Sequence, residues 1–93
     1  MLEGEIQKTA IRHARKRGWW CRKFRSAGRR AAPDYILIKD GRVIFIEYKA
    51  TGERPTELQK EYHEEMRKYG AVVYVCDSIE ASDKALYVEE IEF

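Results

Sequence analysis

Asp34 stands immediately before a run of apolar residues, and Glu47, Tyr48 and Lys49 close the next such run. Two carboxylates held side by side repel each other, and burial makes both of them costly to ionise. A shared proton, a neighbouring cation or a bound metal ion relieves that repulsion. Carboxylates, a backbone carbonyl and waters form the ligand set that Mg²⁺ prefers, so these residue types point to a site for a hard divalent cation.

A hairpin brings the two acids together. Asp40-Gly41 is a strong two-residue turn signal, and counting outward from it pairs Lys39 with Arg42 and, five steps on, Asp34 with Glu47. Directly opposed residues have Cβ atoms roughly 5 Å apart. Side chains alternate between the faces of a sheet, so Lys49 shares the face of both acids. The alternative is that Asp34 merely begins a strand and that Glu47 pairs with Lys49 at a sheet edge.

The elements around this hairpin follow from periodicity and from turn residues. They are a helix over Leu2–Lys16, a strand over Trp19–Phe24, the two hairpin strands, a helix from Pro55 or Thr56 to Tyr69, a strand over Ala71–Cys76, a short helix over Ser78–Lys84 and an edge strand over Leu86–Ile91. The order αβββαβ(α)β predicts an α/β fold, with helices flanking a mixed central sheet.

Length and composition predict one soluble domain over residues 1–93. The chain is 44% hydrophobic and 37% charged. No run approaches the roughly 18 apolar residues of a membrane span, and the N-terminus lacks the apolar core of a secretory signal. We therefore expect an intracellular protein without a membrane partner.

The net charge of +2 conceals a strong asymmetry. Residues 1–33 carry ten Lys/Arg and two acids, a charge of +8, whereas residues 34–93 carry eight and fourteen, a charge of −6. Aromatic residues interrupt the basic tract, as in segments that bind a phosphate backbone and stack on bases. A solvated basic helix with core aromatics explains the tract equally well.

Cysteine and histidine offer no zinc site. Cys21 and Cys76 read as buried thiols, and with His13 and His63 they lack paired ligand spacing. We expect His13 to lie at the surface or contact phosphate, and His63 to be exposed on a charged helix.

The segments Pro33-Asp34 and Glu47-Tyr48-Lys49 resemble the PD-(D/E)XK nuclease motif. Glu5 in the leading helix, "GRRAAPD" before the acid and "EYKATGERPTELQ" after it resemble, more narrowly, the VRR-NUC (virus-type replication-repair nuclease) domain of the stand-alone viral and bacterial type. The similarity runs from Glu5 through Val75. It implies a restriction-endonuclease-like αβββαβ core.

The resemblance also implies roles. Asp34, Glu47 and the main-chain carbonyl of Tyr48 would bind Mg²⁺ or Mn²⁺, with Glu5 completing the metal site, and Lys49 would orient or deprotonate the attacking water. Gln59 matches the helix glutamine that steadies water or substrate. Glu5 is also explained as an acid at a helix start, and Gln59 as part of a capping box with Thr56.

The implied substrate is DNA. The residues expected to contact it are Arg25, Arg29, Arg30, Arg54, Arg12, Arg15 and Lys16. Stand-alone members of the resembled family are homodimers that act on branched DNA, which implies a Holliday junction resolvase in a bacterial or phage-infected cytoplasm. A less selective nickase or flap nuclease and a non-catalytic DNA-binding module are the alternatives. Tyr87, Ile91 and Phe93 are candidates for the dimer surface.

Overall fold

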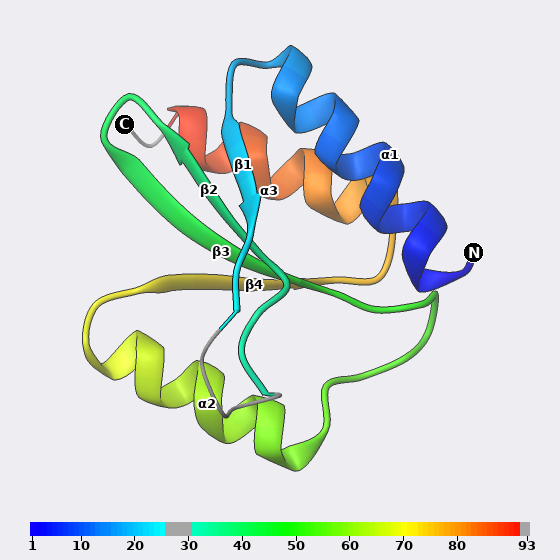
Figure 1. Ribbon diagram of the computed structural model, residues 1–93, viewed down its shortest axis with the longest axis vertical. Coiled ribbons are helices and arrows are strands. Elements are labelled where there is room, and N and C mark those ends of the chain that lie inside the picture. The colour runs from blue at the N-terminus through cyan, green and yellow to red at the C-terminus, as the bar shows by residue number, and fades with distance from the viewer. Residues whose placement is uncertain (26–30, 92–93) are drawn as a thin grey trace.

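The computed structural model describes residues 1–25 and 31–91. The elements are α1 (Glu3–Lys16), β1 (Trp20–Lys23), β2 (Tyr35–Lys39), β3 (Arg42–Tyr48), α2 (Glu57–Lys68), β4 (Val72–Cys76) and α3 (Ile79–Ile91). The strands lie in the order β1-β2-β3-β4; β1, β2 and β3 are antiparallel neighbours and β4 is parallel to β3 (Figure 1). The predicted mixed sheet and αβββαβ order are confirmed.

The central hairpin has the register expected from its turn. Asp40 and Gly41 have φ angles of 48° and 81°, and positive φ at both positions is the requirement of a type I′ turn. Five residue pairs, from Lys39 with Arg42 to Tyr35 with Ile46, lie opposite each other as predicted. Because β1 and β4 flank it on both sides, the hairpin is the middle of the sheet.

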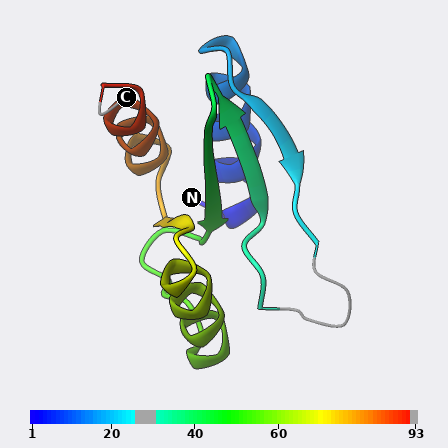
Figure 2. The same cartoon turned by 90° about the vertical axis from the view of Figure 1, so that its left-hand side faces the viewer.

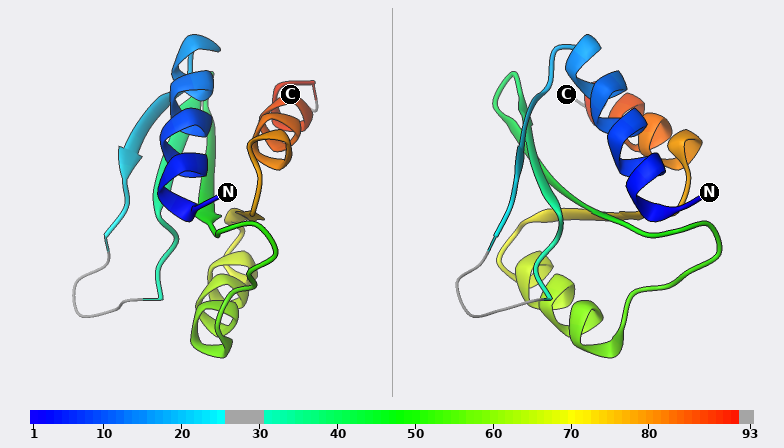
Figure 3. Two further views of the ribbon diagram at one scale, coloured as in Figure 1. Left: turned by 90° about the vertical axis from the view of Figure 1, so that its right-hand side faces the viewer. Right: turned by 45° about the vertical axis from the view of Figure 1, so that its right-hand side comes forward.

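The first face of the sheet, which we call the α1 face, carries the core. Its side chains Leu37, Ile44, Ile46 and Tyr48 are fully buried and pack with residues of α1 and α3. These two helices lie next to each other over this face (Figure 3). The helix residues in this core are Ile6, Ala10, Ile11, Ala14 and Leu86, and Cys21 and Cys76 join it as free thiols.

The opposite face, the α2 face, is only partly covered. Strand alternation places Ile36, Phe45 and Glu47 on it, and α2 packs near the end of the hairpin that lies away from its turn (Figures 1 and 2). Val43, nearer the turn, remains 44% exposed. The α2 face therefore offers open surface beside the Glu47 end of the hairpin.

The predicted edge strand over Leu86–Ile91 is wrong, since one helix spans Ile79–Ile91. Its start is stabilised by the Ser78 hydroxyl, which accepts a hydrogen bond from the backbone N–H of Ala81. The buried positions are Ser82, Ala85, Leu86 and Glu89, at helical spacing. Because two of these four buried residues are polar, the apolar residues of the sequence alone do not show the helical periodicity. Tyr87 and Ile91 are exposed on this helix, and Phe93 lies outside the described residues.

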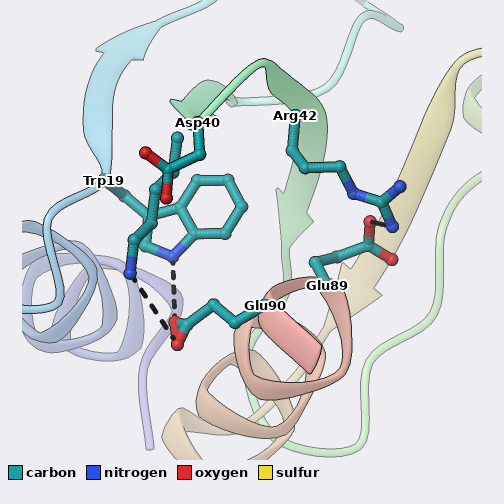
Figure 4. Close-up of a pocket in the computed structure, with 6 residues that line it drawn as sticks. Trp19, Asp40, Arg42, Glu89 and Glu90 are labelled. Carbon is teal, nitrogen blue, oxygen red and sulfur yellow. Dashed lines mark hydrogen bonds and ion pairs between the residues drawn. The ribbon is translucent and has the colours of Figure 1, made fainter. Parts of the chain in front are cut away.

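Ion pairs hold α3 against the hairpin turn. A pocket of about 180 Å³ there is lined by Trp19, Lys39, Asp40, Arg42, Glu89 and Glu90 (Figure 4). Arg42 pairs with Glu89 at 2.7 Å, and Glu90 accepts a hydrogen bond of 3.2 Å from the Trp19 indole. The charges around this pocket thus serve the helix–hairpin contact. None of the helices within residues 1–25 and 31–91 is long and apolar enough to cross a membrane.

Candidate active site

Asp34 is hydrogen-bonded to Tyr48 of β3, the residue that follows Glu47. Its carboxylate Oδ2 accepts a hydrogen bond of 2.7 Å from the backbone N–H of Tyr48, and its carbonyl accepts one of 2.9 Å from Phe24. The structure therefore brings Asp34 and Glu47 together, as the register predicted.

The neighbourhood of Asp34 disfavours its ionised form. The pKa of its carboxyl is raised from 3.8 to about 6, most of all by burial and also by the charge of Glu47 and a hydrogen bond with it. The Tyr48 N–H and Lys49 oppose the rise but do not cancel it. A cation at this point would favour the ionised carboxylate.

Glu47 is 3% exposed and is surrounded by three side chains. Its Oε2 atom lies 3.4 Å from Gln59 Nε2 and 4.0 Å from Lys49 Nζ. Its Oε1 atom lies 3.6 Å from His63 Nε2, and within the described chain both of these atoms lack a hydrogen-bond partner. A buried carboxylate oxygen without a donor leaves an acceptor free for a ligand.

Lys49 directly follows β3 and is buried. Its backbone N–H donates to the Cys76 carbonyl at 2.9 Å, and its side chain is 11% exposed. The alternative of a Glu47–Lys49 pair at a sheet edge is wrong, because β3 lies between β2 and β4.

Gln59 takes part in two contacts at once. Its side-chain oxygen accepts from the Thr56 N–H at 2.9 Å while the Thr56 hydroxyl accepts from the Gln59 N–H at 3.1 Å, which confirms the capping box. The other end of the same amide donates to Glu47. The helix-cap and site roles are therefore compatible.

The prediction of an exposed His63 is wrong: the residue is 1% exposed and faces Glu47. Gln59 and His63 are four residues apart on α2, so both point to the same side of the helix. The four-residue spacing of Gln59 and His63 could have indicated from the sequence that His63 faces the site. The many charged residues of α2 instead suggested an exposed helix.

Glu5 is exposed, and its carboxylate accepts a hydrogen bond of 3.0 Å from the Leu2 N–H, at the start of α1. In the described chain no hydrogen bond joins it to Asp34, Glu47 or Lys49. The start of α1 nevertheless lies beside the loop after Lys49, because Met1 and Thr51 are hydrogen-bonded. The helix-start role is present, and the metal role of Glu5 stays a prediction.

The predicted DNA contacts separate into two groups. Arg25 and Arg54 are exposed in the segments that adjoin Asp34 and Lys49. Arg12, Arg15 and Lys16 lie on α1, away from the two carboxylates. Arg29 and Arg30 lie outside the described residues.

The donor atoms fit a hard cation. Residues 1–25 and 31–91 hold no cluster of three His, Cys, Asp or Glu side chains that could bind a metal. Asp34, the free oxygen of Glu47 and a main-chain carbonyl instead offer oxygen atoms alone. This is the chemistry of Mg²⁺-type sites, which keep several waters.

A mixed αβββαβ sheet with two carboxylates, a lysine and a glutamine at the open end of its central hairpin defines a nuclease core of the PD-(D/E)XK class. No family model matches the chain. A solved structure described as a "VRR_NUC domain" superposes with a TM-score of 0.82 and 33% identity, covering 98% of this chain and 97% of the other. The phage protein "Putative nuclease p44" of Acyrthosiphon pisum secondary endosymbiont phage 1 is 40% identical over 81 residues, 86% of this chain and 87% of its own length. The chain belongs to the VRR_NUC domain family, which confirms the resemblance drawn from its sequence, and it is a nuclease domain.

Proposed function

We propose that the protein is a Mg²⁺- or Mn²⁺-dependent, structure-specific endodeoxyribonuclease that acts on branched DNA as a homodimeric Holliday junction resolvase. The observation that carries the catalytic part is the pair formed by the half-buried Asp34 and the buried Glu47, with Lys49 and Gln59 around them.

Asp34, Glu47 and the carbonyl of Tyr48 would hold the cation, with Glu5 reaching it directly or through water. A divalent ion held by these residues would lower the pKa of water and polarise the phosphodiester. The free Oε1 atom of Glu47 and the raised pKa of Asp34 support this assignment, because a cation would satisfy the first and relieve the second.

The chain's other residues position the reactants. Lys49 would orient the attacking water or, as the neutral amine, take its proton, and as the ammonium it would offset charge developing on the phosphate. Gln59 and His63 keep the Glu47 carboxylate in place from the side of α2. The guanidinium groups of Arg25, Arg29, Arg30 and Arg54 contact the phosphates beside the scissile one.

Recognition is by DNA shape. The domain measures 31 × 31 × 21 Å, close to one turn of duplex, which leaves little surface for reading base edges. A two-fold homodimer presents two sites to a two-fold four-way junction, which gives paired incisions.

The test uses end-labelled duplex, flap and four-way junction with Mg²⁺, Mn²⁺ or EDTA. We expect metal-dependent cutting with the junction preferred, loss of cutting in Asp34→Asn and Lys49→Ala, and full activity in the control Glu61→Gln, an exposed acid on α2. The catalytic proposal fails if no substrate is cut, or if the two site variants cut as well as wild type. Equal cutting of duplex, or a flap preference, removes the resolvase assignment alone. Sedimentation at micromolar concentration tests the dimer.

A further inference from the structure

A basic groove runs along the outer side of α1. It has a volume of about 460 Å³ and is lined by Lys8, Arg12, Arg15 and Lys16, with no acid among them. The Arg15 guanidinium donates to the Cys21 carbonyl, whereas Lys8, Arg12 and Lys16 have no ion pair or hydrogen bond within the described part of the chain. Three cationic groups are thus free to bind an anion.

The groove and the active site lie on opposite sides of the sheet. The buried side of α1 packs on the α1 face, whereas Glu47 is on the α2 face, in contact with His63 of α2. Successive residues of a helix are 100° apart, which turns Arg12 and Lys16 away from the buried Ile6 and Ala10. Figures 1 and 3 show α1 and α2 on opposite sides of the strands.

The stiffness of DNA prevents one duplex from reaching both places. The whole domain is 31 Å across in its longest directions. A duplex turn of about 10 base pairs spans roughly 34 Å, and DNA bends smoothly only over its persistence length of about 150 base pairs. A duplex lying against Asp34 and Glu47 therefore cannot also lie along the groove on α1.

We propose that the groove on α1 binds a second duplex segment, an arm of the branched substrate other than the one being cut, through its phosphates. Four closely spaced Lys/Arg side chains suit a phosphate backbone, which they contact without reading bases. This inference rests on the proposed function for its substrate. It assigns Arg12, Arg15 and Lys16 a role in binding DNA away from the scissile phosphate.

The experiment measures binding in EDTA, so that nothing is cut. A fluorescent duplex of about 10 base pairs is titrated at low salt to obtain the number bound per chain, and a four-way junction is titrated at several salt concentrations. The variant is Arg12→Glu/Lys16→Glu. The matched control is Lys68→Glu/Lys84→Glu, which reverses two exposed lysines on α2 and α3.

We expect two short duplexes per chain for wild type and for the control, and one for Arg12→Glu/Lys16→Glu. For the junction we expect binding about tenfold weaker in the variant, with the slope of log K against log salt reduced by about 2. One duplex per wild-type chain, two in the variant, or an equal loss in the control overturns the proposal. Because binding is read without metal, a protein that cuts no DNA would defeat the proposed function and leave this result standing.

Discussion

Replacing Asp34 by asparagine should change how the stability of the metal-free protein depends on pH. The folded pKa of about 6 lies above the ordinary 3.8, so the native state holds the Asp34 proton more tightly than the unfolded state does. The stabilisation that results is complete below about pH 4 and is lost as the pH rises through about 6. Asparagine cannot titrate, yet its oxygen can still accept the hydrogen bond from Tyr48.

A difference of about two between the folded and unfolded pKa of Asp34 corresponds to roughly 3 kcal/mol in the free energy of unfolding. The partial exposure of Asp34 reduces this contribution to about 1–2 kcal/mol. Urea unfolding in EDTA at pH 4.5 and 7.5 measures it. Wild type should lose about 1–2 kcal/mol more than Asp34→Asn over this interval, since the titrations of groups away from the Asp34–Glu47 pair are common to both proteins. Mg²⁺ or Mn²⁺ should then stabilise wild type at pH 7.5 more than the variant. Identical pH dependence of unfolding in the two proteins would refute the conclusion that burial and the charge of Glu47 raise the pKa of the Asp34 carboxyl.

The other predictions concern single side chains. Lys49→Ala should lower the cleavage rate about 10²–10⁴-fold with little change in DNA affinity, measured by single-turnover kinetics and by anisotropy; an unchanged rate would exclude its role at the water. His63→Ala should reduce kcat more than KM and cost about 2 kcal/mol in urea unfolding, because Glu47 loses a buried neighbour, whereas normal kcat would show that His63 only fills space. Glu89→Ala should cost about 2–3 kcal/mol, because it leaves the half-buried Arg42 and Tyr74 without the buried carboxylate that pairs with both, and a change under 0.5 kcal/mol would contradict this.

The fold around the hairpin was predictable because its determinants are local. Asp40-Gly41 specifies the turn, the turn specifies the register, and the register places Asp34 beside Glu47 whatever the rest of the chain does. The same holds for the capping box that begins α2, since Thr56 and Gln59 are three residues apart.

The errors arose where buried polar groups depend on distant partners. Ser82 is buried in α3 because its hydroxyl meets that of Tyr48, and His63 is buried because it faces Glu47. A prediction based on apolar residues alone assigns such positions to the exposed surface. In the region of α3 it also predicted a strand where the structure has a helix. Their partners lie 34 and 16 residues away and become neighbours only after the sheet has formed.

The sheet separates the chemistry from the surface of α1. Residues that line the basic groove share no side-chain contact with Asp34, Glu47 or Lys49 in the described chain. Substitutions along the outer side of α1 can therefore accumulate without disturbing the hairpin. Under the role proposed for the groove, related nucleases could then differ in the DNA they bind while keeping the same catalytic residues. Under the same proposal, the outer side of this helix is the place where engineering would alter substrate choice, and the hairpin is the part to leave intact.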